Sequence, residues 1–248
     1  MCGLSKGSRS IYSGLFITNC LLNALCNRLI GFAFHFLKMS QDRSTDKSLE
    51  LTILIIRHAE KPDRGWPGPG LSSTGEEDAK SLVIRGWQRA GAWAAFFGRE
   101  PNEADYPRPA SIYAANPTAT ANDDHDDEPS QRPFQTVSAL AARLKIDPIT
   151  NFAVGEEQQL SEAVLKQSGV VLIAWEHKAI LRTLVPNLFN KQIVTGVLPK
   201  KWDGTRFDVV LRCDRDSSGT NWTFRQLCPC LLSNDSALPM ADEPPLAD

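Results

Sequence analysis

The sequence predicts a three-layer α/β/α sandwich built on a mostly parallel sheet. Five short runs have the composition of β-strands, and they span 51–57, 110–115, 170–176, 206–213 and 221–227. Helix-like segments separate the first three runs, and strands that alternate with helices are typical of a sheet covered on both faces. The last two runs flank the polar, turn-forming stretch 214–220. We therefore expect them to form an antiparallel hairpin at one edge of the sheet.

The expected helices follow the strands along the chain. They fall near 83–97, 132–144, 157–167 and 178–190. Pro133 fits the start of the second helix, because its missing N–H costs no hydrogen bond in the first turn. Two long connections, 61–81 and 116–131, leave the ends of predicted strands. Long loops in compact domains are commonly functional, so we place both at the rim of a ligand site.

Length and composition indicate one folded domain. A chain of 248 residues with 42% hydrophobic content can bury one substantial core. We expect this core domain to span 49–232, with a disordered, proline- and acid-containing tail over 233–248. The formal net charge of −2 and the pI near 6.1 provide no broad positive field, which argues against nucleic acid as the main partner.

The cysteines do not form the pattern of a secreted disulfide framework. They cluster toward the two ends of the chain, at positions 2, 20, 26, 213, 228 and 230. Cys228 and Cys230 lack a second pair at metal-ligand spacing, so we expect reduced thiols and no metal site. These expectations favour a cytoplasmic protein.

The N-terminal segment 1–48 differs from the rest of the chain. It has no acidic residue before Asp42, and 11–37 is rich in apolar side chains. Polar residues interrupt this apolar run at Asn19, Asn23, Asn27 and Arg28, which is unfavourable for a membrane-spanning helix. Three interpretations stay open: a natural start at Met39, an organelle-targeting or membrane-anchoring segment, or a structural part of the domain. Only the second would give the protein a membrane partner, through residues 1–38.

Arg57 and His58 end the apolar run 51–56 and are the most informative pair in the chain. A strand that ends here delivers a guanidinium and an imidazole to the carboxyl edge of the sheet, where open α/β folds place their ligand crevices. An imidazole can attack phosphorus when its other nitrogen is held. The neighbouring guanidinium can bind phosphate oxygens through two parallel hydrogen bonds.

Two further motifs lie in order along the chain. Arg132 opens the sequence Arg-Pro-Phe-Gln-Thr at a predicted helix start, and His177 follows the strand-like run 170–176. Together with Arg57-His58 they resemble the histidine phosphatase superfamily, also called phosphoglycerate-mutase-like. Its members have an Arg-His pair after the first strand, Arg-x-x-Gln-Thr opening a helix, and a second His after a later strand. The resemblance covers about 51–227, and it implies a phosphoglycerate-mutase-like fold for this domain.

The resemblance also implies a mechanism. His58 would become transiently phosphorylated, Arg57 and Arg132 would supply fixed positive charge, and His177 would bind a phosphoryl oxygen. The scheme needs no metal and no cofactor, and it makes the substrate a phosphorylated small molecule or a phosphoprotein. The expected activity is that of a metal-independent phosphomonoesterase. A mutase that returns the phosphoryl group to another hydroxyl, and a non-catalytic module that binds phosphorylated ligands, are the alternatives.

The residue that protonates the leaving group is ambiguous in the sequence. Family members that use a glutamate place it in a loop beyond the second arginine, where this chain has Glu156 and Glu157. Acids are also favoured in the first helical turn without any catalytic role. Of the two we favour Glu157. Glu176 is a second candidate, although strand alternation turns it away from the face that His177 uses.

Four residues near these motifs are candidates for substrate binding. They are Glu60, Trp66, Glu176 and Lys178. Glu60 could orient a cation of the pocket or be an ordinary loop acid. Lys178 could add a third cation beside the phosphate, although we favour a solvent-facing side chain at the helix start. Trp66 stands in the Gly/Pro-rich loop and is the tryptophan best placed to contact a substrate.

Overall fold

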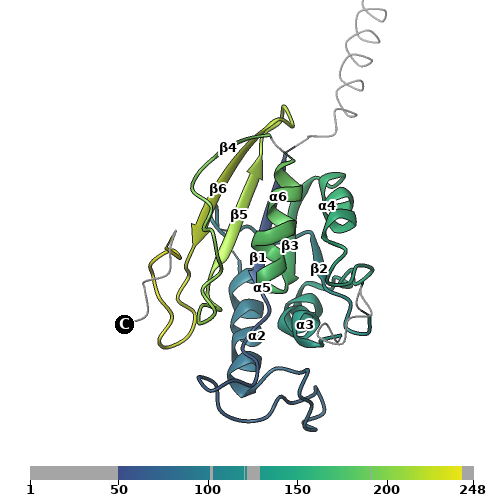
Figure 1. The fold of residues 1–248 in the computed structure, drawn as a ribbon, viewed down its shortest axis with the longest axis vertical. Helices are drawn as coiled ribbons and strands as arrows, with labels where there is room; N and C mark the ends of the chain where they lie inside the picture. The colour runs from purple at the N-terminus through teal and green to yellow at the C-terminus, as the bar shows by residue number, and fades with distance from the viewer. Residues whose placement is uncertain (1–49, 101–102, 120, 122–128, 191, 242–248) are drawn as a thin grey trace, which may run out of the picture. The chain divides into compact units, whose positions relative to one another are not determined.

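The computed structural model describes residues 50–100, 103–119, 121, 129–190 and 192–241. Within them the chain forms one mixed sheet of six strands, in the order β2-β3-β1-β5-β6-β4 (Figure 1). In sequence order the strands are β1 (Leu51–Arg57), β2 (Ser111–Ala114), β3 (Gly169–Trp175), β4 (Ile193–Thr195), β5 (Val210–Arg215) and β6 (Asn221–Leu227). The predicted α/β class with a mostly parallel sheet is confirmed, because three of the strand pairs are parallel and two antiparallel.

The two central parallel strands end side by side. β1 pairs with β3 in the register that sets Arg57 opposite Trp175. The backbone N–H of His58 then donates to the carbonyl oxygen of Trp175 at 3.0 Å, which extends the pairing by one residue. His177 follows the end of β3 by two residues. The register therefore brings both histidines to the same carboxyl edge of the sheet.

Helices cover both faces of the sheet, as the sequence predicted. Alternate residues of β1 point to opposite faces. Leu54 and Ile56 pack with α2 (Ile84–Phe97) and α3 (Arg132–Leu144). Ile53 and Ile55 pack with the second group of helices. That group comprises α4 (Glu157–Leu165), α5 (His177–Ala179), the π-helix η1 (Ile180–Leu184) and α6 (Val185–Phe189).

The predicted helix over 178–190 is interrupted. It consists of α5, η1 and α6, and in η1 the N–H of Val185 donates to the carbonyl oxygen of Ile180, five residues earlier. Pro186 stands at the start of α6 and has no N–H to continue the regular pattern of hydrogen bonds. The wider π turn accommodates this missing donor.

The other side of the sheet differs from the prediction in two details. β5 begins at Val210 and not at residue 206, because Arg206 belongs to a turn in which its N–H donates to the carbonyl oxygen of Asp203. The β5–β6 hairpin is antiparallel as predicted. It is not the edge of the sheet, since the unpredicted strand β4 pairs parallel to β6 on its outer side.

The expectation of a disordered tail is wrong for residues 233–241. Met240 is buried, and its backbone N–H and carbonyl oxygen both bond to the side chain of Gln226. The Asp235 carboxylate binds Arg89 of α2. The folded domain therefore extends past residue 232, whereas 242–248 lie outside the described residues.

The interpretations of the N-terminal segment fall on residues 1–48, which also lie outside the described part of the chain. Among the described residues, no helix has the length and apolar character needed to cross a membrane. The described cysteines, Cys213, Cys228 and Cys230, are free thiols.

Candidate active site

His58 is held by a hydrogen bond that sets the position of its proton. The imidazole is 5% exposed, and its Nδ1 lies 2.8 Å from the carbonyl oxygen of Ala59. A carbonyl oxygen can only accept, so Nδ1 bears the ring proton. Nε2 is consequently left with a free lone pair. This is the state that a nucleophilic imidazole requires.

The surroundings of His58 keep the ring neutral. Burial, followed by the charge of Arg57, lowers the pKa of His58 to about 3 against the opposing hydrogen bond to Ala59. Arg132 and His177 lower the same pKa. The rings of His58 and His177 meet edge to face, with centroids 6.3 Å apart. Arg57, Arg132 and His177 therefore all lie close enough to His58 to act on its charge.

Arg57 is buried at the end of β1, and backbone oxygens fix its guanidinium. One terminal nitrogen lies 2.8 Å from the carbonyl oxygen of Gly204 and 3.1 Å from that of Arg206. The guanidinium carbon lies 3.8 Å from the centre of the Phe207 ring. Burial lowers the pKa of Arg57 to about 10, with nearby carboxylates such as Glu176 opposing the shift, so the side chain stays charged at neutral pH. Its Nε has no hydrogen-bond partner among the described residues.

Arg132 is the first residue of α3, and its side chain contacts the long loop that follows β1. Its Nε donates to the carbonyl oxygen of Ser81 at 3.3 Å, and a terminal nitrogen donates to that of Ala79. Burial lowers its pKa, and Asp78 opposes the shift. The contact joins the 61–81 loop to the start of α3 at the edge of the site. This supports the predicted place of that loop at the rim.

The remaining residues of the Arg-x-x-Gln-Thr motif are structural. The Thr136 hydroxyl accepts from the N–H of Ala59 at 2.8 Å and donates to the carbonyl oxygen of Arg132 at 2.7 Å. Gln135 is buried, and its side chain accepts from the N–H of Leu82. Thr136 thus ties the segment that orients His58 to the turn that presents Arg132.

Glycine is required where α2 approaches this segment. A Cβ atom at Gly86 would stand 2.5 Å from the carbonyl oxygen of Glu60, closer than real contacts allow. The N–H of Val83 donates to that same oxygen at 3.1 Å. The first turn of α2 therefore packs directly on the backbone that follows His58.

His177 is positioned by the residue before it. Its Nδ1 lies 2.8 Å from one carboxylate oxygen of Glu176, a close polar contact that lacks hydrogen-bond alignment. The other oxygen accepts from the N–H of Ala179 at 2.8 Å and caps α5. Burial raises the pKa of Glu176, but His177 and the Ala179 amide outweigh it and lower this pKa to about 2. Glu176 is therefore a carboxylate that orients His177 and holds no proton to donate at neutral pH.

Glu157 is buried and fully engaged by structural partners. One carboxylate oxygen accepts from the N–H of Gly155 and from the indole of Trp175, at 2.8 and 2.9 Å. The other lies 3.2 Å from the Thr183 hydroxyl, whose single proton also faces the carbonyl oxygen of Ala179 at 2.9 Å. Glu156 precedes the same helix, and its side chain accepts from the backbone N–H of Ala153 at 2.8 Å. These bonds tie α4 to β3 and η1, and they give Glu157 a structural role that the sequence analysis weighed only as an alternative.

Glu60 is also occupied by structural contacts. It is fully buried and takes two hydrogen bonds from Nε of Arg89, each 3.0 Å long, and one of 2.8 Å from a terminal nitrogen. Nε of Arg85 lies 3.3 Å away. The charge of Glu60 nevertheless raises the pKa of Arg57. Glu60 therefore influences a site cation through space while its oxygens bind α2.

Trp66 and Lys178 lie at the margin of the site. The Trp66 ring packs edge to face on Phe207, 6.0 Å between centroids, and Phe207 contacts both Arg57 and His58. Lys178 is exposed at the start of α5 and lines a cavity beside the site.

Lys61 is a cation of the site that the sequence analysis missed. Burial, Arg132 and Arg57 lower its pKa, with a smaller contribution from Lys178. Its place directly after the Arg-His-Ala-Glu motif was the available signal.

Comparison with known proteins gives fold-level likenesses only. No family model and no curated protein matches the chain. Among solved structures, the protein histidine phosphatase SixA complexed with tungstate is 17% identical, covers 72% of this chain and 97% of its own, and has a TM-score of 0.42. A mycobacterial glucosyl-3-phosphoglycerate phosphatase is 13% identical, with 72% and 98% covered and a TM-score of 0.39. A protein described as mycobacterial hydrolase 1 is 13% identical, with 71% and 97% covered and a TM-score of 0.41.

The function proposed below rests on the side chains of the site and not on these likenesses. In the described part of the chain, no group of three or more His, Cys, Asp or Glu residues has the geometry of a metal site.

Proposed function

We propose that the protein is a phosphomonoester hydrolase that forms a phosphohistidine at His58. The observation that supports this most is the bond between Nδ1 of His58 and the carbonyl oxygen of Ala59, 2.8 Å long. It leaves the lone pair of Nε2 free within a group of positive side chains. A phosphate dianion repels most nucleophiles, and a neutral imidazole among fixed cations avoids that repulsion.

The first chemical step transfers the phosphoryl group to the imidazole. Nε2 of His58 attacks phosphorus, the N–P bond forms, and the bond from phosphorus to the ester oxygen breaks. Arg57 and Arg132 stabilise the phosphoryl oxygens, because both stay protonated throughout. The leaving oxygen departs with its electron pair and takes a proton from an acid or from water. Neither Glu157, which accepts from Gly155 and Trp175, nor ionised Glu176 is arranged to supply that proton.

The second step hydrolyses the phosphohistidine. Water attacks phosphorus, the new P–O bond forms, and the N–P electron pair returns to Nε2. The water proton leaves to solvent or to the departing phosphate. The proton stays on Nδ1 in both steps, held by its hydrogen bond to the carbonyl oxygen of Ala59, so the ring that is regenerated is already the reactive tautomer. Glu176 holds His177 through Nδ1 at 2.8 Å, and a proton on Nε2 would let this ring donate to a phosphoryl oxygen in each step.

A trapping experiment tests the proposal. The enzyme is mixed with a ³²P-labelled aryl phosphate and quenched in alkali, in which phosphohistidine is stable and acyl phosphate is not. We expect label on the peptide that contains His58, and no label and no turnover in His58→Ala. Lys166→Gln, at an exposed residue before β3 and thus at the opposite edge of the sheet, is the control for general damage.

The same experiment separates the two alternatives from hydrolysis. A mutase would be labelled at His58 but would release little phosphate when a second hydroxyl compound is present. A binding module would retain the aryl phosphate without label or turnover. Stoichiometric release of phosphate, together with label that disappears as substrate is exhausted, is the result that hydrolysis requires.

A further inference from the structure

A cavity of about 710 Å³ opens beside the candidate active site. His177 lines it from α5, and Gly204 lines it from the loop between β4 and β5. The carbonyl oxygen of Gly204 is the one that accepts from Arg57 at 2.8 Å. The cavity therefore shares two of its walls with the group of residues around His58.

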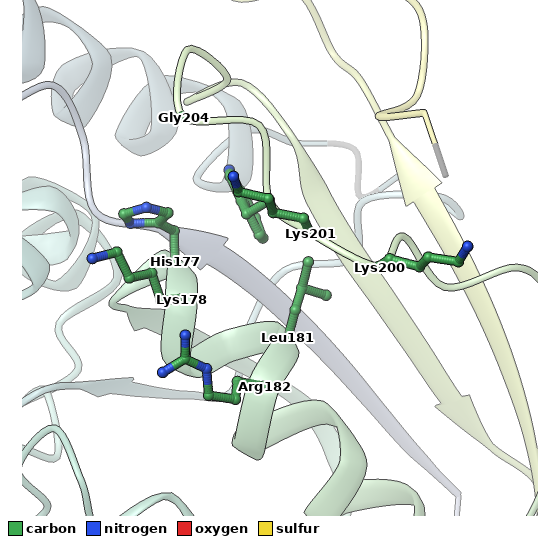
Figure 2. A pocket seen from close by; sticks show the side chains of 8 residues that line it. His177, Lys178, Leu181, Arg182, Lys200, Lys201 and Gly204 are labelled. Carbon is green, nitrogen blue, oxygen red and sulfur yellow. The ribbon is translucent and has the colours of Figure 1, made fainter. Parts of the chain in front are cut away.

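The cavity is lined by cations. Lys178 and Arg182 are four residues apart on α5 and η1 and so lie on one helical face, while Lys201 comes from the opposite loop. Figure 2 shows Lys201 extending toward the side of the cavity where His177 lies, and Lys200 extending to the other side. No carboxylate is among the described residues that line the cavity. In a chain of net charge −2, such a concentration of positive charge is a local feature.

Three of the cations that line this cavity are not neutralised by other described residues. No hydrogen bond or ion pair joins the charged ends of Lys178, Arg182 and Lys201 to another described residue. By contrast, Glu60 and Asp235 neutralise Arg89, which lies elsewhere in the domain. Unpaired cations in a concave site attract anionic ligands and increase their local concentration.

Apolar walls complete the cavity. Leu181 lines it from η1, and Trp202 is buried behind the loop with its indole N–H bonded to the carbonyl oxygen of Arg206 at 2.9 Å. Cavities of this size, with apolar walls and a few converging polar groups, fit small molecules. The apolar side chains of Leu181 and Trp202 could contact the carbon skeleton of a ligand that carries a charged group at each end.

We propose that this cavity binds a second phosphate group of a small phosphomonoester whose first phosphate reacts at His58. The inference rests on the proposed function, because it assigns the reacting end to the same site. Lys178, Arg182 and Lys201 bind the second phosphate, and Leu181 and Trp202 contact the skeleton between the two groups. The substrate class is a small bisphosphorylated compound.

The test uses three phenyl phosphates that differ only at the end of a flexible para-propyl arm, which carries a hydroxyl, a carboxylate or a second phosphate. The full chain is assayed by phenol release, so each compound reports on the same bond. We expect kcat/KM for the phosphate arm to exceed that for the hydroxyl arm by about tenfold or more, the effect of one good charged contact. The carboxylate arm, with one charge, should fall between them.

The variant Arg182→Gln/Lys201→Gln should bring the phosphate-arm and hydroxyl-arm rates to within about twofold, with the hydroxyl-arm rate unchanged. Lys166→Gln removes one exposed charge far from the cavity and should preserve the preference. A preference that survives the double variant overturns the inference, and so does an equal loss on all three compounds. Equal rates for the carboxylate and phosphate arms would contradict the assignment to a phosphate.

The outcomes also separate this inference from the proposed function. Turnover that depends on His58 but shows no preference for the second phosphate removes only the inference about the cavity. Turnover of the hydroxyl-arm compound that persists in His58→Ala removes the proposed function, and the second-phosphate site with it.

Discussion

Nδ1 of His58 lies 2.8 Å from the carbonyl oxygen of Ala59, and the ring is buried near the guanidinium groups of Arg57 and Arg132. Its pKa is lowered from the ordinary 6.5 to about 3, mainly by burial. We therefore expect the ring signals of His58 in NMR spectra to stay constant between about pH 5 and pH 8. The signals are assigned by their absence in His58→Gln. A midpoint near the ordinary pKa would contradict the arrangement.

The pKa of His58 is lower in the folded chain than in the unfolded chain, so the free energy of unfolding depends on pH. The unfolded chain binds a proton at His58 below about pH 6.5, whereas the folded chain does so only near pH 3. The stabilisation of the neutral ring is therefore complete above pH 6.5 and is lost as the pH falls toward 3. Urea unfolding at several pH values should show this slope, and His58→Gln should reduce it.

The hydroxyl of Thr136 connects the His58 segment to α3. In Thr136→Val the buried N–H of Ala59 loses its partner, which costs about 1–3 kcal/mol of unfolding free energy. The loss also frees the backbone that orients His58, and we expect kcat/KM to fall by about tenfold or more. Thr136→Ser retains the hydroxyl and should stay near the wild type in both measurements. Loss of stability without loss of activity would restrict Thr136 to a folding role.

Much of the fold could be predicted because its strands are apolar runs with clear ends. The predicted bounds of β1 and β6 match the structure. β4 was missed because three residues are too few for a periodic pattern. The start of β5 was misplaced because Asp203 and its neighbours form a turn, in which the Asp203 carboxylate accepts from the N–H and the hydroxyl of Thr205.

The site was predictable only where side-chain chemistry is explicit in the sequence. Arg57, His58, Arg132 and His177 come together because strand order and register bring separate motifs to one edge. The contribution of Gly204 had no sequence signal, since it acts through a carbonyl oxygen. The partners of Glu60 and Glu157 could not be predicted, because burial and hydrogen bonding depend on tertiary packing. Glu60 meets Arg89 only when α2 docks.

The buried group formed by Glu60, Arg89 and Asp235 should matter for stability. Burial disfavours the charged form of Arg89, but hydrogen bonds to Asp235 and Glu60 outweigh it and raise its pKa. Arg89→Met leaves two carboxylates without this partner, and we expect a loss of about 3 kcal/mol in urea unfolding.

The double variant Glu60→Gln/Arg89→Met should be less destabilised than Arg89→Met alone, because it removes the stranded charge at Glu60. Equal losses in the single and double variants would mean that pairing with Glu60 contributes little.

The role of Glu157, as proton donor or as structural anchor, can be decided by experiment. The sequence favours it as the acid that protonates the leaving group, whereas its hydrogen bonds to Gly155 and Trp175 indicate a structural anchor. An acid accelerates alkyl esters by about a hundredfold or more and matters little for aryl esters, whose leaving group needs no proton. We expect Glu157→Gln to lower kcat/KM for hexyl phosphate and phenyl phosphate by the same factor. Glu156→Gln, next to it in the chain, is the matched control. A selective loss on hexyl phosphate would instead restore Glu157 as the acid.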